Sequence, residues 1–281
     1  MTVYSRFVAI GDSTVEGLDD PYPDDPGYRG WADRLAARLA EQQPGLLYAN
    51  LAVRGRLVGQ VRAEQLGPAL QMRPDLVAVV AGLNDVLRPK CDMDAVIGDL
   101  EAIFGALTAQ DARVVTFTMP DPGAIMPMAR SVRPRLALYN DGLRMLVDRH
   151  GGALADFDRH PVAGDARLWS PDRLHANTPG HAMMADALAY ALDLPGSDDT
   201  WDRALPPAQR RRRHQIAARE ARWAGQYMVP WIVRRLRGRS SGDGIVAKRP
   251  QLTPVLDTAG PGGADDQARS LLSPRRAAPR C

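Results

Sequence analysis

The chain has 281 residues, of which 45% are hydrophobic and 25% are charged, and its formal net charge at pH 7 is +3. This composition is ordinary for a globular protein, and it excludes collagen, a disulfide-stabilised scaffold and a chain that is disordered throughout. The two cysteines, Cys91 and Cys281, are too few and too far apart for a disulfide framework or a zinc-binding spacing.

Short apolar runs and helical spacings alternate along the first 195 residues and predict five strand–helix units. The expected strands are 7–10, 46–53, 76–80, 114–118 and 153–157. The expected helices are 31–41, 58–70, 93–107, 135–149 and a last helix, capped by Thr178, that ends near residue 192. Because apolar strands that alternate with helices are typical of a parallel sheet covered on both faces, we expect an α/β fold that binds ligands at the carboxyl ends of its strands.

Composition divides the chain into three parts. We expect an α/β domain over residues 1–197, a basic amphipathic helical extension over 198–239 with a kink at Pro230, and a flexible tail over 240–281 that is rich in Gly, Pro and Ser. Charge divides the chain in the same way: residues 1–199 carry 19 basic and 27 acidic side chains, whereas residues 200–281 carry 17 and 6. The small net charge is therefore the sum of an acidic body and a basic segment.

Targeting and membrane-spanning segments are not evident. The N-terminal apolar run has about four residues, whereas a signal peptide needs roughly 7–15. The longest apolar stretch, residues 76–83, is far shorter than the ~18 residues of a membrane span. We therefore expect a cytoplasmic protein.

Polar residues stand at the ends of the predicted strands. Ser13 follows the first strand, Gly55 lies shortly after the second and Asn84 follows the third, while Asp172 and His175 precede the last helix. Since the carboxyl ends of parallel strands meet at one edge of a sheet, these residues are expected to lie close together.

These residue types suit nucleophilic catalysis. A serine hydroxyl must lose its proton to a base as it attacks, His175 can accept that proton, and Asp172 can orient and stabilise the imidazolium. The N–H groups of Ser13 and Gly55 and the side-chain amide of Asn84 can donate to the oxyanion of a tetrahedral intermediate. His181 lies nearby, but only His175 follows an aspartate by three positions.

The arrangement resembles the SGNH hydrolases, the GDSL-type esterase and lipase family. The four similar blocks are FVAIGDS at 7–13, NLAVRG at 50–55, GLND at 82–85 and DRLH at 172–175, within a resemblance that spans about residues 5–192. The resemblance implies a flavodoxin-like three-layer α/β/α sandwich with a central five-stranded parallel sheet. It also implies ester hydrolysis through an acyl-enzyme, with Ser13, Asp172 and His175 as the triad and without a metal. The first block departs from the family pattern, because Thr14 stands where the family name has leucine.

Two further residues are candidates for substrate binding. Asp12 adjoins the nucleophile, and Arg54 directly precedes Gly55, where it could recruit an acidic group or simply be solvated. No nucleotide-binding motif is present, and the remaining histidines have no metal-ligand spacing, so we expect neither cofactor nor metal.

The basic extension, residues 206–239, leaves several interpretations open. It could dock on the acidic body, lie on an anionic membrane surface as a peripheral contact, or bind nucleic acid, which is the least favoured. The sequence thus predicts a serine esterase that cleaves a small or medium acyl ester. The alternative is a non-catalytic binding or regulatory module that acts through this extension.

Overall fold

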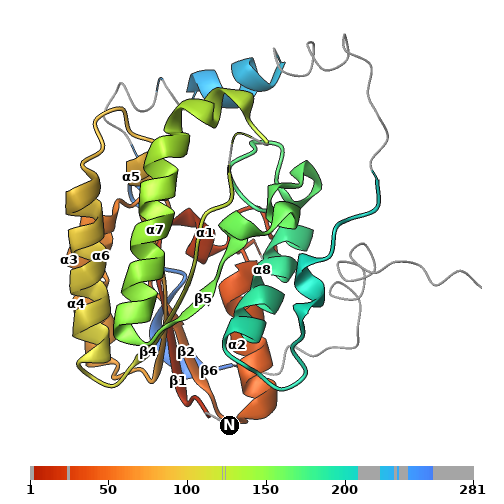
Figure 1. Ribbon diagram of the computed structural model, residues 1–281. Coiled ribbons are helices and arrows are strands. Elements are labelled where there is room, and N and C mark those ends of the chain that lie inside the picture. Colours follow the sequence, from red (N-terminus) through yellow and green to blue (C-terminus); the bar gives the residue numbers. More distant parts are fainter. Residues whose placement is uncertain are drawn as a thin grey trace, which may run out of the picture.

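The structure, a computed structural model, describes residues 3–23, 26–121, 123, 125–207, 222–230, 233 and 240–255. Its centre is a six-stranded sheet in the order β5-β4-β3-β1-β2-β6 (Figure 1). The strands are β1 Arg6–Gly11, β2 Leu47–Asn50, β3 Leu76–Val80, β4 Arg113–Phe117, β5 Ala153–Ala155 and β6 Arg249–Pro254.

The first five strands are parallel, and β6 runs antiparallel to β2. The register places Ala9 of β1 between Asn50 of β2 and Ala78 of β3. All five residues of β3 are buried, as expected for an apolar strand in the middle of a sheet that is covered on both faces.

Helices cover both faces of the sheet and make a three-layer α/β/α sandwich (Figure 1). Helices α2 and α8 pack together on one face, and α3, α4, α6 and α7 lie on the other. The helices are α1 Ser13–Glu16, α2 Gly30–Gln42, α3 Val58–Glu64, α4 Leu66–Gln71, α5 Leu83–Val86, α6 Met93–Thr108, α7 Arg133–His150 and α8 Thr178–Ala191.

The predicted α/β class is confirmed, with two local corrections. The expected helix over 58–70 is two helices, α3 and α4, that meet at Gln65. The cap of α8 is Asn177 instead of Thr178, because the Asn177 side chain accepts a hydrogen bond from the Gly180 N–H at 3.1 Å. Thr178 is the first residue inside the helix.

The expectation of five strands is wrong, because β6 comes from the segment that was expected to be a flexible tail. Pro250 and Pro254 suit an edge strand, where some backbone N–H groups need no ladder partner, and the pairing with β2 shifts register between Tyr48 and Asn50. Leu252 packs against the hydrophobic core. A composition rich in turn-forming residues hides such a strand, since its stability comes from its partner.

The basic extension is described only in part. Residues 222–230 are helical and include a π-helical stretch, Ala224–Met228, whereas 208–221, 231–232 and 234–239 lie outside the described residues, as does the tail from 256 onward. No helix in the described part of the chain is long and apolar enough to cross a membrane. Contact of residues 206–239 with a membrane or with nucleic acid therefore stays a prediction.

Candidate active site

The candidate site lies where the strand order reverses. Strands β2 and β3 both pair with β1, so the chain crosses over between β1 and β3, and α/β sheets bind ligands outside the carboxyl ends of such strands. Ser13 begins α1 directly after β1, and Asn84 lies in α5 directly after β3. The sheet therefore brings together two residues that are 71 positions apart in the sequence.

The turn before the serine depends on Gly11. Its φ is 153°, and a methyl group built on it would lie 2.1 Å from the carbonyl oxygen of Val80, so a larger residue would push β1 away from β3. The buried side chain of Gln65 accepts a hydrogen bond from the Gly11 N–H at 2.8 Å and donates one to the Gly11 carbonyl at 2.9 Å. Gln65 is not among the predicted site residues, because nothing near it in the sequence indicates that it contacts β1.

Three predicted side chains form one hydrogen-bonded chain. The Ser13 hydroxyl lies 2.9 Å from Nε2 of His175, and Nδ1 of His175 lies 2.6 Å from Oδ2 of Asp172. A proton on Nδ1 makes Nε2 the acceptor for the serine proton, which is the tautomer that a general base requires. The side chains of His175 and Asp172 are 16% and 22% exposed, so the site is sheltered but open to a substrate.

A tight loop fixes the acid and the base relative to each other. Oδ1 of Asp172 accepts hydrogen bonds from the backbone N–H groups of Leu174 and His175, at 2.9 and 3.1 Å. The loop is closed below these residues by a hydrogen bond from the Ser170 N–H to the His175 carbonyl at 2.8 Å. The three-residue spacing seen in the sequence is thus a turn that wraps around its own carboxylate.

The charges around His175 favour its protonated form. Burial alone would lower the pKa of His175, but the hydrogen bond and the charge of Asp172 outweigh burial, and the pKa is raised above 6.5. For Asp172 burial would raise the pKa, yet the hydrogen bonds from His175 hold it below 3.8. The pair therefore stabilises an imidazolium beside a carboxylate, which is the state formed when the serine gives up its proton.

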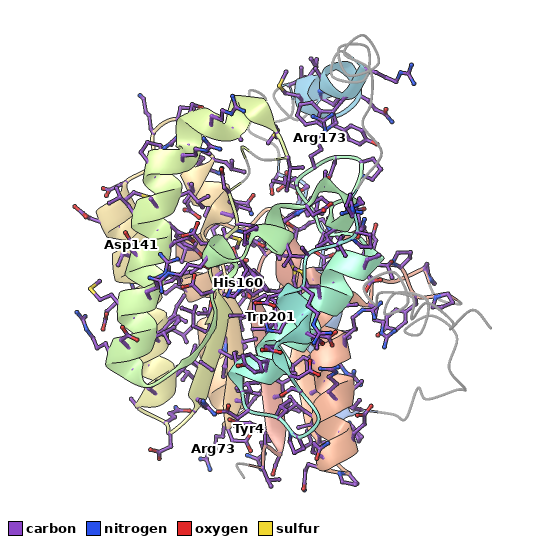
Figure 2. All side chains as sticks on the ribbon, turned by 45° about the vertical axis from the view of Figure 1, so that its right-hand side comes forward. Tyr4, Arg73, Asp141, His160, Arg173 and Trp201 are labelled. Carbon is purple, nitrogen blue, oxygen red and sulfur yellow. The ribbon has the colours of Figure 1, made fainter. Side chains whose placement is uncertain are left out.

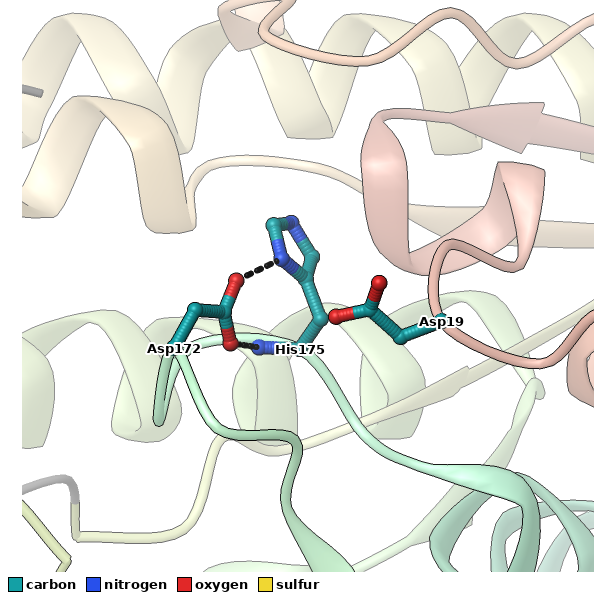
Figure 3. A group of neighbouring side chains, drawn as sticks. All are labelled: Asp19, Asp172 and His175. Carbon is teal, nitrogen blue, oxygen red and sulfur yellow. Dashed lines mark hydrogen bonds and ion pairs between the residues drawn. The ribbon is translucent and has the colours of Figure 1, made fainter. Parts of the chain in front are cut away.

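Asp19 is a second carboxylate near His175, on the other side of the imidazole from Asp172 (Figure 3). Each of Asp19, Asp172 and His175 offers one ligand atom within 4.8 Å of the others, a spacing that could hold a metal ion. Both ring nitrogens of His175 are already engaged, one by Asp172 and one by Ser13. The arrangement fits proton transfer better than ligation, and the absence of a metal stays a prediction.

Asn84 faces the same recess as the serine. A cavity of about 10 Å³ is lined by Asp12, Ser13, Thr14, Leu83, Asn84, Leu174 and His175. The side-chain amide of Asn84 donates to Oδ2 of Asp12 and to the carbonyl of Arg56, both at 3.1 Å. Asp12 also accepts from the Thr14 N–H at 3.0 Å, and its burial raises its pKa to about 6. Asp12 thus orients the Asn84 amide; its predicted contact with substrate is not tested.

Gly55 lies on the loop after β2, outside the residues that line the recess, and its role as an oxyanion donor stays a prediction. Arg54 is held by Glu16 through its backbone N–H at 2.8 Å and through its guanidinium, which also lies 5.3 Å from the centre of the Tyr28 ring. These contacts balance the charge of Arg54 within the protein and favour a structural role over the recruitment of an acidic substrate group.

His181 has a different role from His175. Its Nδ1 accepts a hydrogen bond from the Trp31 N–H at 3.1 Å, and its Nε2 lies 2.9 Å from the Leu18 carbonyl. Burial lowers the pKa of His181 to about 4, so the ring is neutral at pH 7. It joins α8 to α2 and has no contact with Ser13 among its hydrogen bonds.

Comparisons with known proteins agree with the fold. LAE5, an alpha/beta hydrolase enzyme from the metagenome of Lake Arreo, Spain, shares 25% identity at a TM-score of 0.55, and the match covers 67% of this chain and 95% of LAE5. TesA shares 19% identity at a TM-score of 0.55, and the match covers 66% of this chain and 97% of TesA. A mutant of Axe2, an acetylxylan esterase from Geobacillus stearothermophilus, shares 16% identity at a TM-score of 0.56. That match covers 71% of this chain and 97% of the Axe2 chain. No curated protein sequence matches the chain.

A family model places the chain more firmly. Residues 9–183, more than half of the chain, match the model of the GDSL-like lipase/acylhydrolase family. The match contains Ser13, Asn84, Asp172 and His175 and ends before the basic extension begins. The chain therefore belongs to the GDSL-like lipase/acylhydrolase family and is a carboxylic ester hydrolase.

Proposed function

We propose that Ser13 is the nucleophile of a serine esterase, with His175 as general base and Asp172 as the residue that orients it. The observation that carries this proposal is the unbroken hydrogen-bonded chain from the Ser13 hydroxyl through His175 to Asp172. Such a chain activates a serine that is otherwise a poor nucleophile.

In the first half of the reaction, Oγ of Ser13 bonds to the ester carbonyl carbon while His175 takes the hydroxyl proton. The bond to the alcohol oxygen then breaks, and the imidazolium gives its proton to the leaving alcohol. In the second half, His175 takes a proton from water as the water oxygen attacks the acyl-enzyme. The serine leaves as it regains a proton, and a carboxylic acid is released.

The oxyanion of each tetrahedral intermediate needs donors that are already in place. The N–H groups of Ser13 and Gly55 and the amide of Asn84 are the proposed donors. Support comes from the recess that Ser13, Asn84 and His175 share. In the free protein the Asn84 amide donates to Asp12 and to the Arg56 carbonyl, so one of these hydrogens must turn to the oxyanion when it forms. Loss of one such donor typically lowers kcat by about 10²–10³.

The acyl group of the proposed substrate is short. The recess beside Ser13 encloses about 10 Å³, about the space of one water molecule, so a long acyl chain would have to lie outside it. A cavity of about 290 Å³ between α2 and α8 shares no lining residue with this recess. That the structural neighbour Axe2 is an acetylxylan esterase agrees with a short acyl group.

The first test compares p-nitrophenyl acetate with its longer-chain esters on wild type and Ser13→Ala. We expect wild type to prefer the acetate, and Ser13→Ala to lose at least about 10³ in kcat. Ser197→Ala is the matched control, since this hydroxyl bonds the Leu194 carbonyl at 2.6 Å, outside the site. Equal rates for wild type and Ser13→Ala would refute the triad.

The second test labels the nucleophile directly. A fluorophosphonate should modify Ser13 in wild type, and it should react more slowly with His175→Ala, because the hydroxyl then lacks its base. Peptide mapping identifies the modified serine. If wild type turns over no ester and Ser13 stays unlabelled, the non-catalytic alternative replaces this proposal.

A further inference from the structure

The chain returns to the catalytic edge after the family domain has ended. The family match stops at residue 183, whereas described residues 222–230 and 240–255, here called the C-terminal brace, contact loops on two sides of the candidate site. One contact is to the backbone of Asp172, and the other is to the peptide that joins Arg54 to Gly55.

The first contact is made by Trp223. This side chain is buried, and its Nε1–H donates a hydrogen bond to the backbone carbonyl of Asp172 at 3.2 Å. The guanidinium of Arg173 lies 4.7 Å from the centre of the Trp223 ring, a cation–π contact, and Figure 2 shows Arg173 beneath the short helix that carries Trp223. Arg173 has a φ of 63°, a conformation unfavourable for a side chain of its size. Trp223 therefore adds an outside contact to a turn that the loop's own hydrogen bonds already form, at its most strained residue.

The second contact is made by Gly242. A methyl group built on Gly242 would lie 2.1 Å from the carbonyl oxygen of Arg54, so the two backbones touch with no room for a side chain. This carbonyl belongs to the same planar peptide as the N–H of Gly55, the proposed oxyanion donor. Whatever pushes the Arg54 oxygen also tilts the Gly55 N–H, so Gly242 sets the direction of that donor.

The brace is itself firmly anchored to the body. Strand β6 pairs with β2, with Arg249 opposite Asn50. The ammonium of Lys248 donates to the carbonyls of Tyr28 and Arg29, at 2.9 and 2.8 Å, and lies 2.9 Å from the Asp33 carboxylate. These anchors do not involve the triad, so residues 240–255 are a fixed support for the loop after β2.

We propose that Trp223 and Gly242 are positioning residues of the esterase: Trp223 holds Asp172 against His175, and Gly242 aims the Gly55 N–H at the oxyanion. The proposal rests on the function proposed above and extends the working site beyond the family domain. Neither residue is among those that line the recess. Trp223 acts through the carbonyl of Asp172, and Gly242 acts through the Arg54 carbonyl, which shares a peptide with the Gly55 N–H.

The Trp223 contact is tested with Trp223→Phe and Trp223→Ala. The phenylalanine keeps a ring over Arg173 but loses the N–H donor, and the alanine loses both. We expect kcat to fall roughly threefold in Trp223→Phe and at least roughly tenfold in Trp223→Ala. KM should change by less than about twofold in both variants. In Trp223→Ala a less firmly held Asp172 should raise the pKa of His175 less. The fall of activity on the acid side of the pH–rate profile, the acid limb, should therefore move to lower pH. The control Trp201→Phe alters a similarly buried tryptophan whose Nε1 has no hydrogen-bond partner in the part of the chain that is described, and it should lower only thermal stability.

The Gly242 contact is tested with Gly242→Ala. We expect kcat to fall by roughly ten- to a hundredfold, a part of what a lost oxyanion donor costs, with the acid limb unchanged because His175 is untouched. Gly244→Ala is the matched control: Gly244 has a φ of 76° but open space around it, so the substitution strains the turn without pressing on Arg54. It should lower thermal stability and leave kcat as in wild type.

Each rate is divided by the concentration of protein whose Ser13 is labelled by a fluorophosphonate. Unfolded protein, which does not react, is therefore not mistaken for a loss of kcat. The proposal would be overturned if both Trp223→Ala and Gly242→Ala had the kcat of wild type and the same acid limb in the pH–rate profile. Equal losses in the two control variants would also overturn it, because they would show a general effect of stability. An unlabelled Ser13 in active wild type would instead refute the proposed function, and the positioning roles with it.

Discussion

The imidazole of His175 lies between two carboxylates that differ in what they do to it (Figure 3). Asp172 bonds to the ring and fixes its tautomer, whereas Asp19 acts through its charge and also raises the pKa of His175. Removing Asp172 would disturb geometry and charge together. Asp19 offers a way to change the charge alone.

Asp19→Asn should shift the acid limb of kcat/KM to lower pH. The base is neutral His175, so activity falls as the pH drops through its raised pKa; without the Asp19 charge that pKa is lower and the enzyme stays active in more acidic solution. Asparagine suits the φ of 68° at this position, so the fold should be preserved and the plateau kcat should stay within about threefold. A pH–rate profile measures the shift, and an unchanged or alkaline-shifted limb would contradict it.

The sequence predicts some site residues well because their relation is local. Asp172 and His175 lie on one turn, and the strand before Ser13 ends in the glycine that the turn needs. Gln65 and Trp223 were missed for the opposite reason: each reaches the site from a segment more than 45 positions away from its partner, with no spacing to reveal the contact. Arg173 likewise contacts Trp223, which lies outside the family match.

Among the elements, α8 is tied to α2 and to the loop after α1 by one buried histidine. His181 must be neutral to accept the Trp31 N–H on Nδ1, and a protonated ring would lose that bond. The ion pair of Asp20 with Arg34 at 2.9 Å lies beside it and is equally buried. Charge on His181 would therefore disturb the contact between the two helices that cover one face of the sheet.

His181 should make the protein less stable in acid. Its pKa is about 4 in the folded protein, lowered by burial, against 6.5 for an exposed histidine, so the unfolded chain binds more protons between these values. Its contribution is fully present above pH 6.5 and is lost as the pH falls toward 4, by about 3 kcal/mol at most. His181→Gln cannot titrate and should show a flatter decline of unfolding free energy between pH 7 and pH 4 in denaturant titrations. Parallel curves for the two proteins would refute this.

Element prediction succeeded where a segment's own pattern fixes its structure. Strand β3 has five consecutive apolar residues and is buried along its length, so its position follows from composition. Strand β6 has only Leu252 packed against the core, and its ladder depends on the free edge of β2. Its sequence, RPQLTP, carries turn-forming residues that indicate a loop until that partner is known.

At the scale of the whole molecule, the acidic body and the segment that follows it are not independent. The sheet takes its sixth strand from 249–254, and Lys248 brings a half-buried ammonium to Asp33. The Asp33 carboxylate also accepts hydrogen bonds from the hydroxyls of Tyr22 and Tyr48 at 2.7 Å. Burial lowers the pKa of Lys248, and the charge of Asp33 opposes that effect. The charge asymmetry along the sequence is thus partly cancelled inside the fold.

A chain that ends at residue 239 should be less stable than one that ends at 255. The shorter chain leaves Asp33 without its ammonium, a loss of roughly 3 kcal/mol, or roughly 10 °C in melting temperature for a protein of this size. It also leaves the edge of β2, Leu47–Asn50, unpaired, and exposed edges promote self-association. Thermal melts and sedimentation velocity compare the two chains, and the chain that ends at 255 controls for removal of the residues beyond β6. Equal melting temperatures and a monomeric short chain would show that β6 and Lys248 add nothing to the sheet, in conflict with the pairing and the ion pair that hold them there.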